Sequence, residues 1–100
     1  KLDLTTATAT KLYTVPTNYV TVVESLMVAE DSGNADTITV TITNGSSVFT
    51  LFHVKAVGAS TTVELISKDL ILTAGDIVHV TAATANRLHV IMSLVQIPLA

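Results

Sequence analysis

Apolar and polar side chains alternate along much of this 100-residue chain, and a period of two residues is typical of β-strands with one buried face. The clearest segment is TITVTIT at residues 37–43. There Ile38, Val40 and Ile42 fall on one face and the threonines on the other. The pattern predicts a strand whose inner face is core and whose outer face carries hydroxyl groups.

Residues 19–29 form a second apolar segment, which differs from the first because both of its faces are apolar. The alternation places Val20, Val22, Leu26 and Val28 on one face, with Glu24 interrupting it, and Val23 and Met27 on the other. Such a strand is expected in the centre of a sheet or covered on both sides.

Short clusters of turn-forming residues separate the apolar segments, and Asn44-Gly45 is a strong turn signal because both residue types tolerate a positive φ. The composition includes 17 Thr and 14 Val, β-branched residues that favour strands. A helical turn competes only near Leu65–Leu72. About eight strands are predicted near residues 8–15, 19–29, 37–43, 48–57, 61–66, 69–72, 77–82 and 87–97.

This pattern predicts an all-β fold, an antiparallel β-sandwich of the jelly-roll type, with an immunoglobulin-like sandwich as the alternative. A chain of 100 residues has room for one core, so residues 11–100 are expected to form a single domain. Residues 1–10 are rich in Thr and Ala and lack a strong apolar pattern. We predict that they form an extended N-terminal arm that lies against a neighbouring subunit.

Charge is scarce, since 13% of the residues are Asp, Glu, Lys or Arg against about 25% in ordinary soluble domains. The net charge is −3 and the five basic residues are scattered, which disfavours a nucleic-acid partner. The longest apolar run is Leu26–Ala29, so no membrane partner is expected. With 49% hydrophobic residues and few charges, some apolar surface is expected to be buried against other protein subunits.

Three histidines, His53, His79 and His89, are the first candidates for chemistry, because metal-dependent cupin enzymes share the jelly-roll fold. The cupin pattern has two His one residue apart followed by Glu, and neither His79-Val80-Thr81 nor His53-Val54-Lys55 supplies it. We therefore interpret the histidines as strand or interface residues and expect no metal and no cofactor. No cysteine is present to bind metal or act as a nucleophile.

Other polar residues receive the same structural interpretation. Asp31, Asn34 and Asp36 carry oxygen ligands of the kind that Ca²⁺ prefers, but their spacing is not that of an EF-hand and such residues also stabilise turns. Carboxylates for glycoside hydrolysis would come from Glu24, Glu30 and Glu64, which lie in ordinary strand or turn positions. No serine lies in a nucleophile-elbow motif. No catalytic residue is predicted.

Aromatic residues, which form the stacking platforms of sugar-binding sites, are limited to Tyr13, Tyr19, Phe49 and Phe52. Phe49 and Phe52 are expected on opposite faces of one strand, so that at least one of them belongs to the core.

Two motifs support a resemblance. Leu12-Tyr13-Thr14-Val15-Pro16 precedes the strand at residues 20–28, and Leu72-Thr73-Ala74-Gly75-Asp76 leads into Ile77-Val78-His79-Val80. Over roughly residues 11–97 this arrangement resembles small β-sandwich virion proteins of tailed bacteriophages, of the capsid decoration or cement type.

The resemblance implies a structural protein, not an enzyme, which binds the major capsid protein on the capsid surface of the virion after synthesis in the host cytoplasm. It also implies a homo-oligomer, with a trimer favoured because decoration proteins often occupy threefold positions. A tail or head-closure component, or a receptor- or glycan-binding module, is the alternative of a different class. A cupin-like isomerase or lyase is the enzyme alternative.

Overall fold

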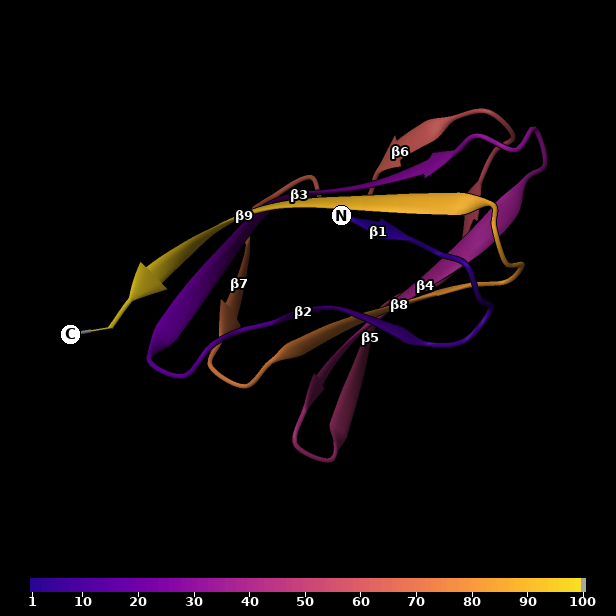
Figure 1. Ribbon diagram of the computed structural model, residues 1–100. Helices are drawn as coiled ribbons and strands as arrows, with labels where there is room; N and C mark the ends of the chain where they lie inside the picture. Colours follow the sequence, from indigo (N-terminus) through magenta and orange to yellow (C-terminus); the bar gives the residue numbers. More distant parts are fainter. Residues whose placement is uncertain (100) are drawn as a thin grey trace.

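The computed structural model (Figure 1) describes residues 1–99, and within that range every regular element is a β-strand. Eight of the nine strands correspond to the eight that the sequence predicts, and the added one is β1 at the N-terminus. Their bounds are β1 Leu2–Asp3, β2 Thr10–Thr14, β3 Tyr19–Glu30, β4 Asp36–Asn44, β5 Ser47–Val57, β6 Thr62–Glu64, β7 Leu70–Thr73, β8 Ile77–Ala82 and β9 Leu88–Pro98.

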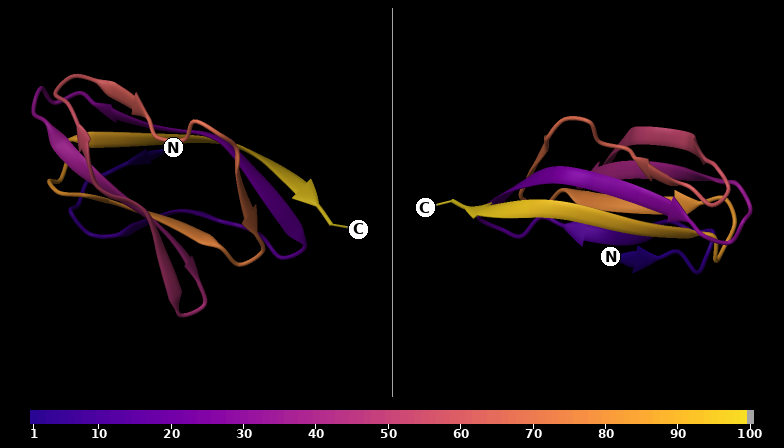
Figure 2. Two further views of the ribbon diagram at one scale, coloured as in Figure 1. Left: turned by 180° about the vertical axis from the view of Figure 1, so that it is seen from behind. Right: turned by 90° about the horizontal axis from the view of Figure 1, so that it is seen from above.

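The strands form two antiparallel sheets that pack as a sandwich, seen from two further sides in Figure 2. Sheet A has the order β1-β9-β3-β6, with β7 pairing to the same edge of β3 as β6, and sheet B has the order β2-β8-β4-β5. The first strand therefore pairs with the last and β2 pairs with β8. Nearer the middle of the chain, β3 pairs with β7, and β4 and β5 form a hairpin. This rolled-up ribbon is the jelly-roll arrangement, which confirms the predicted fold class.

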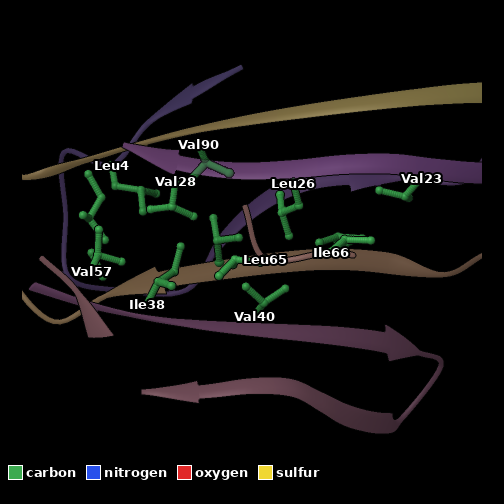
Figure 3. Close-up of a cluster of buried hydrophobic side chains, with 14 of the residues drawn as sticks. Leu4, Val23, Leu26, Val28, Ile38, Val40, Val57, Leu65, Ile66 and Val90 are labelled. Carbon is green, nitrogen blue, oxygen red and sulfur yellow. The ribbon is translucent and has the colours of Figure 1, made fainter. Parts of the chain in front are cut away.

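The core lies between the two sheets (Figure 3) and consists of Val, Leu and Ile side chains from both inner faces. Ile38 and Val40 from sheet B are fully buried, as the alternation in TITVTIT predicts, and they face Val23, Leu26 and Val28 from sheet A. Leu65 and Ile66, where the sequence allows a helical turn, instead form a non-helical link between β6 and β7. The amide of Leu65 donates to the carbonyl of Leu26 at 2.9 Å.

A β-bulge in β3 corrects the predicted faces of that strand. The pairing with β9 shifts register between Val23 and Ser25, so Val23 joins Leu26 and Val28 in the core. Simple alternation places Val20 and Val22 on the same face as Leu26 and Val28, but they point to the opposite, outer face. An extra residue in one strand changes which face the later residues occupy, and simple alternation cannot anticipate it.

The same effect corrects the prediction for β5. Phe49 pairs with Ile42 and Phe52 pairs with Val40, and both partners lie on the inner face of β4. The two phenylalanines therefore lie on the same side, because register shifts along this pair insert extra residues into β5. Phe52 packs against the core, whereas Phe49 is exposed.

The N-terminal segment also differs from its prediction as a separate arm. Leu2 and Asp3 pair with Val90 and His89 of β9, and the side chain of Leu4 is 1% exposed within the core. The amide of Leu4 donates to the carbonyl of Leu88 at 3.0 Å. This segment is therefore part of the sandwich, and the exposed residues 5–9 connect it to β2. Residues 1–99 contain no helix with the length and apolar character needed to cross a bilayer.

Candidate functional site

The three histidines lie on different strands, His53 on β5, His79 on β8 and His89 on β9. The Nδ1 atom of His79 lies 3.5 Å from the Thr43 hydroxyl. In the described part of the chain no three His, Cys, Asp or Glu side chains gather as a metal site would require.

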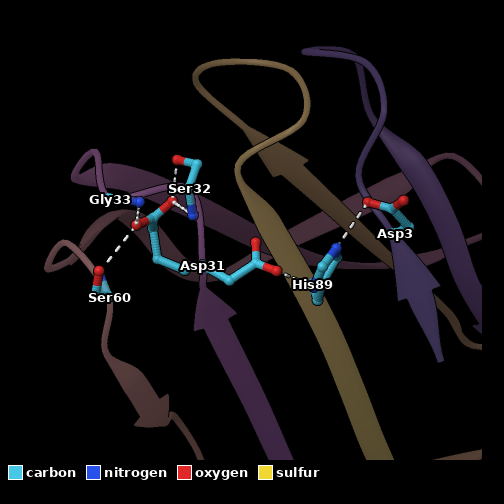
Figure 4. Close-up of polar contacts among 7 residues, drawn as sticks. Asp3, Asp31, Ser32, Gly33, Ser60 and His89 are labelled. Atoms are coloured by element: carbon cyan, nitrogen blue, oxygen red, sulfur yellow. Dashed lines mark hydrogen bonds and ion pairs between the residues drawn. The ribbon is translucent and has the colours of Figure 1, made fainter.

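His89 has two acidic neighbours at one end of sheet A (Figure 4). Its Nε2 atom lies 3.2 Å from a carboxylate oxygen of Asp3, and its Nδ1 atom lies 3.6 Å from one of Asp31. All three side chains are well exposed to solvent. The imidazole thus links the N-terminal strand to the loop after β3. Each of its two ring nitrogens lies next to a carboxylate oxygen.

The acidic loop after β3 is organised by Glu30, a residue that the sequence analysis treats as an ordinary strand position. Its side chain is buried, and its carboxylate accepts hydrogen bonds from the amides of Ser32 at 2.8 Å, Gly33 at 3.0 Å and Ser60 at 3.0 Å, and from the Ser32 hydroxyl. Figure 4 shows these partners around one carboxylate. The Ser32 hydroxyl and the three amides favour the charged form and lower the pKa of Glu30 to about 2, although desolvation opposes them.

Asp31, Asn34 and Asp36 have different partners; Asp31 and Asn34 lie in the loop after β3, whereas Asp36 is the first residue of β4. Asn34 donates from its side chain to the carbonyl of Ser32 at 3.4 Å. Asp36 is buried and accepts from the amide of Thr84 at 3.1 Å, which joins the start of β4 to the loop between β8 and β9. Together with the Asp31 contact to His89, these bonds direct the three side chains away from a common point.

Glu64 also serves the fold, because its carboxylate accepts from the Ser25 hydroxyl and from the amides of Leu26 at 2.9 Å and Ile66 at 3.1 Å. Desolvation raises the pKa of Glu64, but these hydrogen bonds outweigh it and hold the pKa below its usual value. Glu24 is exposed on the β3 bulge. Glu30 and Glu64 thus accept hydrogen bonds from different parts of the chain, and Glu24 lies apart from both on the bulge.

The two motifs behind the resemblance meet at one end of the molecule. The amide of Val15 donates to the carbonyl of Asp76 at 2.9 Å, and the amide of Gly75 donates to the carbonyl of Val15 at 3.1 Å. Gly75 has φ of 88°, a conformation that strongly favours glycine. Asp76 accepts from the amide of Thr73 at 2.9 Å and from the side chain of Asn44. Desolvation raises the pKa of Asp76, and these bonds lower it further than desolvation raises it.

The aromatic side chains are distributed between structure and surface. The Tyr13 hydroxyl lies 2.8 Å from the hydroxyl of the buried Thr21, and it accepts from the side-chain amide of Gln96 at 2.6 Å. Tyr13 therefore links the two sheets. Tyr19 packs partly against the core, as Phe52 does. Among residues 1–99, Phe49 is the one aromatic side chain left largely exposed, at 61%.

Phe49 belongs to the β4–β5 hairpin, which extends outward at the lower edge of Figure 1. The hairpin turns at Gly45, which has φ of 60° as the Asn44-Gly45 signal predicts. Its second strand, β5, is the outer strand of sheet B, and within the described residues it pairs with β4 alone. Four large apolar side chains are exposed on the two faces of this outer strand, and we call this set the β5 edge: Val48, Phe49, Leu51 and Val54.

The β5 edge has two parts that differ in regularity. From Ser47 to Thr50 the pairing with β4 is continuous, whereas the register shifts lie farther along the strand. Val54 lies in the irregular part and has φ of 51°, which is unusual for a β-branched residue. Its amide donates to the Thr39 hydroxyl at 3.1 Å. The regular part next to the turn is therefore the part best shaped to pair with another strand.

The hollows of the surface are shallow and open. The three that stand out have volumes of about 310, 370 and 200 Å³. The first lies beside Asp3 and His89, the second lies beside Asp36 and Arg87, and the third lies between Phe52 and Leu70. Known ligand sites are more enclosed and have a few polar groups that converge on the ligand. The extended apolar β5 edge is the more distinctive surface feature.

No protein-family model, curated protein or solved structure matches this chain. The surface of the molecule is therefore the basis for a functional proposal. Low charge and high apolar content predict an apolar contact surface but not its location, because period-two alternation gives the face of a residue and not the order of the strands in a sheet.

Proposed function

We propose that this protein is a non-enzymatic virion structural protein, a capsid decoration protein that stabilises the head by contacting neighbouring capsid subunits. The observation that supports this most is the β5 edge, where Val48 and Phe49 are more than half exposed at 62% and 61%. Large exposed apolar groups on a small domain mark surfaces for contact with other proteins.

The regular part of the edge suggests how the contact is made. Edge strands present backbone N–H and C=O groups that pair readily with another chain, and proteins that do not use them protect them with charges or proline. Residues 47–54 of β5 contain no Asp, Glu, Lys, Arg or Pro. A strand or loop of the major capsid protein that pairs with Ser47–Thr50 gains backbone hydrogen bonds, while Phe49 supplies an apolar anchor.

The hydrogen-bonded carboxylates and His89 support a structural role as well. Glu30, Asp36, Glu64 and Asp76 all accept hydrogen bonds from within the chain, and His89 lies between two carboxylates. These side chains stabilise loops and strand ends, and this structural role explains their presence without a catalytic role.

The test uses capsid shells assembled from the major capsid protein of the same virus, without the decoration protein. The parental protein is expected to bind these shells and to raise the temperature at which they dissociate. Phe49→Lys is expected to weaken binding by about 30-fold or more, since loss of an aromatic anchor typically costs about 2 kcal/mol.

Ala59→Lys is the matched control, because it adds the same charge at an exposed loop position beyond the other end of β5. It is expected to bind shells as the parental protein does. The proposal is wrong if the parental protein does not bind the shells, or if Phe49→Lys and Ala59→Lys bind equally well.

A further inference from the structure

The tip of the β4–β5 hairpin contains the pair Asn44-Gly45, whose chemistry plays no part in the proposed capsid contact. Asn44 is the last residue of β4 and pairs with Ser47, so Gly45 and Ser46 form a two-residue turn. Gly45 has φ of 60°, and Ser46 does not have a positive φ. This combination is typical of a type II′ turn, which has glycine at its first central position. The turn itself therefore requires a glycine directly after Asn44.

The surroundings of Gly45 leave its backbone nitrogen accessible. Asn44, Gly45 and Ser46 are all exposed, and a Cβ atom added at Gly45 would have no atom within 4 Å. Within residues 1–99 the Gly45 amide donates no hydrogen bond in the turns and loops. An unhindered nitrogen that is not engaged as a donor can approach the side chain of the residue before it.

We propose that Asn44 is a site of spontaneous deamidation and that its hydrogen bond to Asp76 slows this reaction. The Gly45 nitrogen attacks Cγ of Asn44 and loses its proton, and the Cγ–Nδ2 bond breaks to release ammonia. The product is a five-membered succinimide ring, which one water molecule then opens. Cleavage of the new N–Cγ bond gives aspartate at position 44. Cleavage of the bond between the nitrogen and the backbone carbonyl carbon gives isoaspartate, in which the main chain passes through Cβ.

Asp76 is well placed to hold the Asn44 side chain. Its Oδ1 atom accepts from Nδ2 of Asn44, and its Oδ2 atom accepts from the Thr73 amide at 2.9 Å and the Thr73 hydroxyl at 3.3 Å. Ring closure requires the Asn44 side chain to rotate about its Cα–Cβ bond until Cγ reaches the Gly45 nitrogen. A hydrogen bond to a carboxylate opposes that rotation more strongly than a bond between neutral groups. Its loss is expected to speed deamidation about tenfold.

Deamidation changes the contact between the hairpin and the turn at residues 74–76. A carboxylate at position 44 has no N–H group to donate, so it faces the Asp76 carboxylate as a like charge. Isoaspartate also lengthens the main chain beside the turn by one carbon atom. Val48 and Phe49 follow closely in β5, so the modification acts on the support of the β5 edge. The reaction itself does not depend on the proposed capsid contact, and neither do the measurements that test it.

Peptide mapping by mass spectrometry, after incubation of the folded protein at mildly alkaline pH, measures the modification at each asparagine. Replacement of the side-chain NH2 by OH changes the peptide mass, and labelling by an isoaspartyl methyltransferase identifies isoaspartate. Asn18, Asn34 and Asn86 are internal controls, because each precedes a residue with a side chain. Asn44 is expected to deamidate first. An Asn44 that stays intact, or that reacts no faster than the controls, overturns the proposal.

Asp76→Asn tests the protective bond and is expected to speed deamidation of Asn44 about tenfold. Asp69→Asn is the matched control, because it removes the same charge at an exposed position before β7 and is expected to leave the rate unchanged. Equal rates in these two variants contradict the protective role of Asp76.

Exchanging the two groups separates the specific bond from a general loosening of the turn. Asn44→Asp alone is expected to lower Tm, because it places two carboxylates together. Adding Asp76→Asn is expected to raise Tm again, since the amide at position 76 can donate to the carboxylate at position 44 while its oxygen still accepts from Thr73. A double variant that is no more stable than Asn44→Asp shows that the two side chains are not coupled and overturns the proposal.

Discussion

Because the backbone at Val54 is left-handed, we predict that glycine gives a more stable protein than alanine at position 54 and a less stable one at position 56. Val54 has φ of 51°, and its side chain is 53% exposed. Ala56 lies on the same strand, is exposed, and does not have a positive φ. The comparison uses Val54→Ala, Val54→Gly and Ala56→Gly. Val54→Ala and Val54→Gly both remove the methyl groups of valine, so their difference isolates the Cβ atom.

The magnitudes follow from backbone conformation. A Cβ atom in the left-handed region costs about 1–2 kcal/mol, whereas glycine in an ordinary strand costs about 0.5–1 kcal/mol relative to alanine because the unfolded chain gains freedom. At position 54 the relief of strain exceeds the glycine cost, so glycine is favoured over alanine by roughly 0.5–1 kcal/mol. At position 56 glycine is disfavoured by about 0.5–1 kcal/mol. The effect of replacing alanine by glycine on the free energy of unfolding thus differs between the two positions by about 1–2 kcal/mol, or roughly 5–15 °C in Tm.

Thermal unfolding followed by circular dichroism, with every variant at the same protein concentration, measures these differences. The hydrogen bond from the backbone N–H of residue 54 to the Thr39 hydroxyl is present in every variant. It therefore does not affect the difference in stability between the variants. If alanine is more stable than glycine at both positions by the same amount, position 54 is not left-handed and the reasoning is refuted.

Three further predictions concern the core, the Glu30 loop and the N-terminal segment. Ile38→Asp is expected to prevent folding, because it buries an unpaired charge, whereas Thr39→Asp on the outer face retains the fold; similar melting curves would contradict the register. Folding lowers the pKa of Glu30 from 4.5 to about 2, so its stabilisation is complete above pH 4.5 and is lost as the pH falls toward 2. Urea unfolding of Glu30→Gln should therefore depend less on pH in that window than unfolding of the parental chain, and parallel profiles would count against the role of this carboxylate. Leu4→Ala is expected to lower the free energy of unfolding by about 2–5 kcal/mol, since Leu4 is 1% exposed, and an unchanged value would mean that the segment is detached.

The strands and the fold class could be predicted from the sequence because they depend on local alternation. The face assignments in β3 and β5 could not, since one extra residue at Glu24 or near Leu51 reverses the alternation without any distinctive residue type. The strand β1 was missed because Leu2 and Asp3 are too few to show a period.

The exposed apolar surfaces could be predicted only in kind. Low charge and high apolar content predict that some apolar side chains are exposed, but their location depends on strand order and on bulges. The same limit applies to Glu30, whose bond to the Ser60 amide spans 30 residues, and to Asp36, whose bond to the Thr84 amide spans 48. The local signal for Glu30 is an acidic residue at a strand end with Ser and Gly two and three residues later, and it does not reveal the distant partner.

The rolled-up order of the strands has a consequence for how the chain reaches its native state. The β4–β5 hairpin joins neighbours in sequence, whereas β1 pairs with β9 across nearly the whole chain. Local hairpins close in microseconds, and pairings between distant segments make folding slow, in the range of milliseconds to seconds. Because β9 lies between β1 and β3, sheet A cannot close during synthesis until β9 has left the ribosome. Until then β3 has an unpaired apolar edge, which makes the nascent chain prone to aggregation and a candidate for chaperone binding.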